Sequence, residues 1–523
     1  MKKIYATFIL IFLQAAVTYS QTIFQKTYGG SNAEWGNAVI PLSDGSYIIA
    51  GSTNTFGAGN YDFYLLKLNN NGDTLWTKTY GGAQDDIATA AQQTSDGGFI
   101  IVGHSSSAPT AGNSDICLVK TDGNGNLLWS KNYGGAETDE GYAVQQTADG
   151  GFVIAGNTLS FSGDGTSDGL LIKTNSSGDT AMTRLMRGLF DDWSYSVVQA
   201  NDGGYLLFGV TTNFGPGIYD LFVQKITTGG FTQWAKAYGG FAFEYGFTLL
   251  KTINGYAIAG QTSTFGAGDM DMYLLNLDSS GNVLWSKTYG GNVTDVPYAA
   301  AQTTDGGFIL GGYTTSFGGH DNYLVRTDNS GNMLWSKTYG GSDDDEIYSV
   351  KQTADGGFIA VGHTYSFGAG LSDIYVIKTD SAGNSGCNQA SPATIAGTPS
   401  TQTVNFTPPS GSGLSVFNPS FTTAGGCSVN TLCLVTGTEQ EIEKGNHSSI
   451  FPNPATDRVT IANLQFAVSE IEIFNSLGEK ISSRKLGAIN NEVIFNVSSL
   501  ARGIYLAKVK GTGEAAIFKF VKE

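Results

Sequence analysis

The sequence predicts an all-β protein: a seven-bladed β-propeller, closed by its N-terminal strand and followed by a linker and a small β-sandwich. Three observations lead to this prediction: a motif that recurs about every 52 residues, four strand-like runs in each recurrence, and turn dipeptides between the runs. The composition agrees, because 72 Gly and 12% aromatic residues with only 14% charged residues are typical of short strands joined by tight turns.

The repeat is marked by a segment of the form Gly-Asp-Thr-Leu-Trp, first seen at residues 72–76. The positions equivalent to its Trp recur at steps of 53, 53, 52, 51, 50 and 52 residues. Phe24 occupies the same position 52 residues before Trp76, and the last copy, at residues 383–387, is decayed. The sequence therefore contains seven units.

The units contain four strand-like runs each, apart from the last, which contains three. In the last unit these are residues 348–353, 358–362 and 373–378, and the fourth is missing. The connecting turns are Asp-Gly-Gly and Asn/Asp/Ser-Gly, which supply the positive φ angles of tight hairpins. Because residues 23–28 read as a fourth strand without the first three, we expect them to complete the seventh blade and close the ring. The alternative, an open solenoid, would leave two blade faces exposed.

The blade pattern resembles kelch repeats, with an apolar run ending in Gly, a later Tyr-type strand and a Trp. Residues 120–129 (Lys-Thr-Asp-Gly-Asn-Gly-Asn-Leu-Leu-Trp) also resemble quinoprotein-type repeats. Both resemblances concern blade architecture and carry no function over. We find no ligands for a quinone and expect no cofactor, with Ca²⁺ left open.

The longer connections of every blade fall on one face, where we expect any ligand to bind. One position in these connections is always acidic: Glu34, Asp86, Asp139, Asp192, Glu244, Asp295 and Asp345. Two interpretations are open: each acid accepts backbone N–H groups in a local turn, or the seven form a ring that attracts Ca²⁺ or basic ligands. A second repeated acid, heading the third strand, is interpreted as turn-forming: Asp62, Asp115, Asp168, Asp220, Asp271, Asp321 and Asp373.

One connection departs from the repeat, and we expect any unique functional patch there: Arg184, Arg187, Phe190 and Trp193. We find no catalytic motif in the secondary-structure context that its chemistry requires. His104 and His363 share a position that we interpret as a variable surface site. We therefore expect no enzyme but a binding or scaffold protein that recognises glycan or protein; a polysaccharide hydrolase using loop-face carboxylates is the alternative.

The N-terminus and the cysteines indicate an exported protein. Residues 1–20 have the basic start, apolar run and small residues of a secretory signal peptide. We expect no membrane-spanning segment in the mature chain, and the net charge of −17 argues against nucleic acid as a partner. Cys117 falls in a strand and is expected to be a buried free thiol. One disulfide is expected among Cys387, Cys427 and Cys433, with the pairing open.

After the propeller, predicted for residues 21–386, the chain is rich in Ser, Thr, Pro and Gly, and residues 387–449 are predicted to be a linker. Five alternating runs then predict a sandwich: residues 458–461, 470–474, 492–497, 503–509 and 516–520.

The segment 450–523 resembles the type A C-terminal sorting domain of type IX secretion cargo. The matching elements are Pro452-Asn-Pro454, Ile473-Phe-Asn-Ser-Leu-Gly-Glu-Lys480, Leu500-Ala-Arg-Gly-Ile-Tyr-Leu506 and Lys522. The resemblance implies export by Sec, handling by the type IX machinery, and release or anchoring at the cell surface after removal of the tag.

Overall fold

The computed structural model describes residues 21–107, 113–162, 165–406, 415–417, 428–435, 449–451, 455–462, 468–475, 480–489, 492–511 and 515–522. Every regular element in these ranges is a β-strand, so the all-β prediction is confirmed. The chain forms two compact units, residues 1–438 and 439–523. The predicted signal peptide, residues 1–20, lies outside the described residues.

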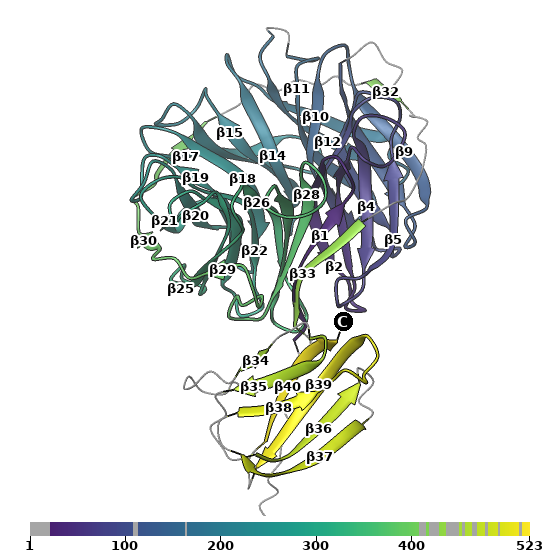
Figure 1. Ribbon diagram of the computed structural model, residues 1–523. Helices are drawn as coiled ribbons and strands as arrows, with labels where there is room; N and C mark the ends of the chain where they lie inside the picture. Colours follow the sequence, from purple (N-terminus) through teal and green to yellow (C-terminus); the bar gives the residue numbers. More distant parts are fainter. Residues whose placement is uncertain are drawn as a thin grey trace, which may run out of the picture. The chain divides into compact units, whose positions relative to one another are not determined.

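Seven antiparallel sheets make up the first unit (Figure 1). Sheets 1 to 3 contain β2 (Glu34–Pro41), β3 (Tyr47–Thr53), β4 (Asp62–Leu68) and β5 (Thr74–Tyr80); β6 (Asp86–Gln93), β7 (Phe99–Ser105), β8 (Asp115–Thr121) and β9 (Leu127–Gly134); β10 (Asp139–Gln146), β11 (Phe152–Thr158), β12 (Asp168–Thr174) and β13 (Thr180–Met186). Sheets 4 and 5 contain β14 (Asp192–Gln199), β15 (Tyr205–Thr211), β16 (Asp220–Ile226) and β17 (Thr232–Gly239); β18 (Glu244–Lys251), β19 (Gly255–Thr262), β20 (Asp271–Asp278) and β21 (Val283–Gly290). Sheets 6 and 7 contain β22 (Asp295–Gln302), β23 (Phe308–Thr314), β24 (Asp321–Thr327) and β25 (Met333–Tyr339); β26 (Asp345–Gln352), β27 (Phe358–Thr364), β28 (Asp373–Thr379) and β1 (Ile23–Gly29).

The repeated four-stranded antiparallel sheet is confirmed, and the turn residues adopt the expected conformations. Gly97 of an Asp-Gly-Gly turn has φ of +82°, and Gly72 of the other turn type has φ of +76°. In sheet 7 the fourth strand is β1, which pairs antiparallel with β28 and places Phe24 opposite Lys378.

The core of the first unit lies between the sheets. Seven clusters of buried apolar side chains each span two sheets, six of them between sheets that follow one another in the chain. The remaining cluster joins sheet 7 to sheet 1, with Phe24, Val361 and Val376 against Val39 and Tyr64. The first strands of successive sheets also contact one another, and β2 contacts β26.

Within the part of the predicted linker that the structure describes, five strands pair with the outer edges of the sheets. They are β29 (Gln389–Ala390), β30 (Ile395–Gly397), β31 (Gln402–Asn405), β32 (Ser415–Phe417) and β33 (Ser428–Val435), which we call the belt. The structure differs here from the sequence prediction because such edge pairing uses backbone groups and leaves no hydrophobic alternation in the sequence. Cys387 is disulfide-bonded and Cys117 is free and buried; Cys427 lies outside the described residues.

The second unit has two antiparallel sheets. One contains β34 (Ser449–Phe451), β35 (Arg458–Ala462) and β38 (Glu492–Asn496); the other contains β36 (Val468–Asn475), β37 (Lys480–Ile489), β39 (Gly503–Gly511) and β40 (Ala515–Lys522). Both contribute to one core that includes Val459, Ile471 and Phe520. The strand β37 was not predicted, because it is an edge strand whose residues 480–485 are exposed and, apart from Ile481, polar or charged.

Candidate functional site

The seven repeated acids at the start of the first strands are all fully buried, with 0% exposure. Six of them accept a hydrogen bond from the second Gly of the preceding Tyr-Gly-Gly segment, as Glu34 does from Gly30 N–H at 2.8 Å. The Ser or Thr that ends the second strand donates its hydroxyl to the same carboxylate, as Thr262 does to Glu244 at 2.8 Å. These contacts favour the turn-forming interpretation, because the carboxylates tie two loops together instead of facing solvent.

The second repeated acid meets the first at each boundary between sheets. At Gly81 an added Cβ would lie 1.9 Å from Asp62 Oδ1 and 2.7 Å from Asp86 Oδ2, so only glycine fits between the two carboxylates. The same arrangement surrounds Gly29, Gly134, Gly239, Gly290 and Gly340. Burial raises the pKa of Asp62 to about 6 and that of Asp220 to about 7, and the neighbouring acid adds to both shifts.

The irregular connection replaces two of the repeated contacts between sheets 3 and 4. Elsewhere the Tyr of Tyr-Gly-Gly donates to a turn carbonyl of the next sheet, as Tyr80 does to Gly125 O at 2.5 Å. Here Met186 stands in the Tyr position, and Arg184 donates from Nε to the equivalent Gly230 O at 2.7 Å. Arg187 occupies the glycine position between the paired carboxylates, with Nε 2.9 Å from Asp168 Oδ2.

The four residues of the predicted asymmetric patch therefore serve separate purposes. Arg184 reaches a tight turn of sheet 4, whereas Arg187 also donates to Phe161 O in a long loop. Trp193 stacks on Tyr219 with ring centroids 5.9 Å apart, and Phe190 is 62% exposed. Both arginines thus compensate for missing repeat residues, and a functional patch at these four residues stays a prediction.

An arc of aromatic side chains crosses five consecutive sheets, three residues after each repeated acid. It contains Tyr142, Tyr195, Phe247, Tyr298 and Tyr348, with successive ring centroids 4.8–6.0 Å apart. In sheets 1 and 2 the same position holds Asn37 and Thr89. The arc therefore ends at Tyr348 of sheet 7, where a smaller side chain follows.

A cavity of about 420 Å³ lies where the arc ends, between sheet 7 and sheet 1. It is lined by Trp35, Asn37, Asp344, Glu346, Tyr348, His363 and Tyr365. The predicted surface position of His363 is in fact buried, with the imidazole stacked on Tyr348 at 5.4 Å. Sequence reasoning missed this site; the signal that could have found it is the change from aromatic residues to Asn37 at one repeat position.

Glu346 is held as a carboxylate within the cavity wall. Tyr348 Oη donates to Glu346 Oε2 at 2.5 Å, and His320 Nε2 lies 2.9 Å from Glu346 Oε1. Burial, the largest influence, raises the pKa of Glu346, but the hydrogen bonds from His320 and Tyr348 outweigh it and the pKa is lowered overall. The contact with Glu346 raises the pKa of His320, whereas burial lowers that of His363.

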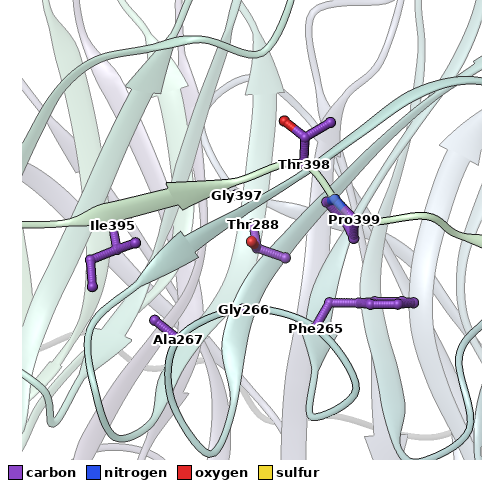
Figure 2. Close-up of a pocket in the computed structure, with 8 residues that line it drawn as sticks. All are labelled: Phe265, Gly266, Ala267, Thr288, Ile395, Gly397, Thr398 and Pro399. Atoms are coloured by element: carbon purple, nitrogen blue, oxygen red, sulfur yellow. The ribbon is translucent and has the colours of Figure 1, made fainter.

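A second cavity, of about 250 Å³, lies beside β30 where this strand pairs with β21 at the edge of sheet 5. Figure 2 shows Phe265 and Pro399 at one end and Ile395 and Ala267 at the other. No charged side chain lines it, and belt residues form one wall. It offers a ligand few polar partners, so the cavity between sheets 7 and 1 is the stronger candidate site.

No group of three or more His, Cys, Asp or Glu residues in the described ranges is arranged to hold a metal ion. No helix among these residues is long and apolar enough to cross a membrane.

Residues 449–523 match the secretion system C-terminal sorting domain. The regulatory protein FlaEY of Caulobacter vibrioides is 28% identical to this chain over 141 residues, which are 22% of this chain and 15% of FlaEY. The match thus spans only a small part of that relative.

Among solved structures, Sqt1 from Chaetomium thermophilum is similar with 15% identity and a TM-score of 0.38, covering 66% of this chain and 82% of Sqt1. A protein of unknown function from Dyadobacter fermentans has 12% identity and a TM-score of 0.34, covering 68% of this chain and 98% of that protein. Neither similarity adds to the account of the cavity. The C-terminal match bears on export alone: the sorting domain supports a type IX secretion cargo that is released or anchored at the cell surface.

Proposed function

We propose that this protein is a secreted or surface-anchored binding module whose first unit is a closed seven-bladed β-propeller. Three observations support the closed ring: β1 completes sheet 7, an apolar core joins sheets 7 and 1, and one cavity of about 380 Å³ is lined by first-strand residues of sheets 1, 2, 3, 4 and 7. The likeness of the repeats to kelch or quinoprotein-type blades stays a prediction. The proposed domain bounds are residues 1–20, 21–386, 387–449 and 450–523, with the belt strands inside the third segment.

The ligand site that we propose is the cavity between sheets 7 and 1. A single observation carries the proposal: the aromatic arc is interrupted at Asn37, which opens a space beside Trp35, Tyr348 and Tyr365. Its volume of about 420 Å³ falls in the range of small-molecule sites, which is roughly 300–1,000 Å³. Aromatic faces next to Asn and carboxylate oxygens suit a sugar, because one face of a sugar ring is apolar and its hydroxyls need hydrogen-bond partners.

The charges of the cavity restrict the class of glycan. Asp344 and Glu346 contribute two carboxylates, and no Lys or Arg is among the lining residues. The buried His363 has a lowered pKa and is neutral at neutral pH. Neutral or amine-bearing sugars are therefore favoured, and uronic or sialic acids are disfavoured by repulsion between like charges.

The lowered pKa of Glu346 favours a binding protein over a glycosidase. A glycosidase needs one carboxylic acid whose pKa is raised so that it can protonate the leaving group. The pKa of Glu346 is lowered, and the side chain of Asp344 is 63% exposed. Hydrolysis by loop-face carboxylates remains the alternative that a turnover assay on any bound oligosaccharide would reveal.

The test is a glycan array probed with residues 21–523. We expect binding to neutral or amino-sugar glycans that is lost in Trp35→Ala and in Glu346→Gln. The matched controls are Trp193→Ala and Glu140→Gln, because these residues hold the same repeat positions in sheets 4 and 3, and Glu140 accepts the same 2.5 Å hydrogen bond from Tyr142. If binding survives in the first two variants, or is lost equally in the controls, the cavity is not the binding site. If no glycan on the array binds, the proposal that the ligand is a glycan is wrong.

A further inference from the structure

The belt passes along the outer edges of the sheets in the reverse of their chain order. It pairs first with β25 of sheet 6, then with β21 of sheet 5 and β17 of sheet 4, later with β9 of sheet 2, and finally with β1 of sheet 7. Every pairing is antiparallel to the outermost strand of the sheet. The chain enters the belt from sheet 7, whose strand β28 ends at Thr379, and β33 at the end of the belt returns to sheet 7 beside β1 (Figure 1).

The beginning of the belt is fixed by one buried side chain of the closing strand. Gln25 of β1 is fully buried and donates from Nε2 to Cys387 O at 2.6 Å and to Ser385 Oγ at 2.7 Å. Its Oε1 accepts from Tyr375 Oη at 2.5 Å and from Asn388 Nδ2 at 3.2 Å. The amide thus holds the segment that contains Cys387 against sheet 7.

The last strand of the belt, β33, also lies beside Gln25. In the pairing of β33 with β1, Cys433 lies opposite Gln25, and a bulge follows between Gln25 and Lys26. The backbone register therefore brings Cys433 to the residue whose side chain holds Cys387.

We infer that Cys387 is bonded to Cys433, and that this disulfide closes the belt into a covalent loop around the sheets. Cys387 is disulfide-bonded and Cys117 is free, which leaves Cys427 and Cys433 as possible partners. The register at Gln25 selects Cys433. Formation of the bond is an oxidation of two thiols to one disulfide with release of two protons and two electrons to an oxidant, the thiol-oxidising machinery of an extracytoplasmic compartment.

The loop has a mechanical consequence for the closing strand. β1 lies between β28 and β33, with a strand hydrogen-bonded on each side. Release of β1, which would open the ring between sheets 7 and 1, requires β33 to leave its edge first. The disulfide ties β33 to the start of the belt, so it opposes this opening and is expected to slow unfolding.

Counting free thiols tests the pairing. The chain has four cysteines, and Cys427→Ser leaves three. If Cys387 is bonded to Cys433, the oxidised variant denatured without reductant has one reactive thiol, that of Cys117. If the partner is Cys427, the same variant has three reactive thiols, and the inference is overturned.

Unfolding kinetics test the consequence. In denaturant without reductant, the double variant Cys387→Ser/Cys433→Ser is expected to unfold at least about tenfold faster than the oxidised wild-type chain. Cys427→Ser is the matched control and should unfold at the wild-type rate. Reduced wild-type chain should behave like the double variant. Equal rates for all four samples would show that the belt does not restrain the ring.

Discussion

The boundary between sheets 3 and 4 and the boundary between sheets 7 and 1 both depart from the repeat, with opposite results. At the first, Met186 and Arg187 replace Tyr and Gly, and the two arginines restore the contacts that were lost: Arg184 reaches Gly230 O and Arg187 pairs with Asp168. At the second, Asn37 replaces an aromatic residue and nothing fills the space. The unusual arginines thus keep the boundary between sheets 3 and 4 packed, whereas the smaller Asn37 leaves a cavity at the boundary between sheets 7 and 1.

The comparison shows which kind of irregularity leaves room for a ligand between two sheets. Arginines in a Gly-rich connection attract attention, yet here they satisfy buried groups of the scaffold. A change from Tyr to Asn at a position that faces the neighbouring sheet removes volume and leaves polar groups around the gap. A site in a repeat protein is therefore better sought by asking which side chain has become smaller.

The largest expected effect concerns Arg187. In Arg187→Ala the fully buried carboxylate of Asp168 loses its cation, and the free energy of unfolding should fall by about 3 kcal/mol. Denaturant melts of both proteins at pH 8 measure this loss. A variant as stable as wild type at pH 8 would show that Arg187 does not compensate for the missing glycine.

Asn37→Tyr should remove ligand binding. The substitution restores the residue found at this position in sheets 3, 4, 6 and 7 and should fill the cavity. We expect affinity for the glycan identified on the array to fall at least about tenfold, which is about 1.4 kcal/mol, with the melting temperature unchanged or raised. Calorimetric titration measures the affinity. Unchanged affinity would place the ligand elsewhere.

The boundaries that keep their glycine should make stability depend on pH. Asp62 and Asp220 have pKa values raised from 3.8 to about 6 and about 7 in the folded chain. Between these limits the folded state binds more protons than the unfolded state, so stability falls as pH rises from about 4 to about 7 and is level above. Thermal melts at pH 5 and pH 7.5 should show the higher melting temperature at pH 5. The double variant Asp62→Asn/Asp220→Asn should reduce the difference; a higher melting temperature at pH 7.5 would contradict the assignment.

The smallest expected effect is that of Arg184→Ala. The change removes the hydrogen bond to Gly230 O, and a loss of about 1 kcal/mol is expected. Tyr80→Phe is the matched comparison, because Tyr80 makes the equivalent bond to Gly125 O. Denaturant melts of the two variants should give similar losses. If Arg184→Ala leaves the stability unchanged while Tyr80→Phe lowers it, the two hydrogen bonds are not equivalent.

Much of the scaffold follows from the sequence, because its signals are local and repeated seven times. The Gly-Asp-Thr-Leu-Trp step, the Asp-Gly-Gly turns and the alternating strands each report on neighbouring residues. The belt does not, since β30 and β31 add to sheet edges through backbone groups and carry no apolar pattern. The cavity could not be predicted from the sequence either, because it is lined by residues from opposite ends of the repeat array, such as Trp35 and Tyr348. The role of Gln25 likewise depends on a contact with Cys387, far along the chain.

The most direct test of the proposed binding site is a crystal structure of residues 21–523 with the best neutral oligosaccharide from the array. The account predicts a sugar ring against Trp35, with hydroxyls within hydrogen-bond distance of Glu346 and Asn37. A sugar bound at the exposed residues near Phe190, or in the cavity beneath β30, with the space between sheets 7 and 1 empty, would contradict it.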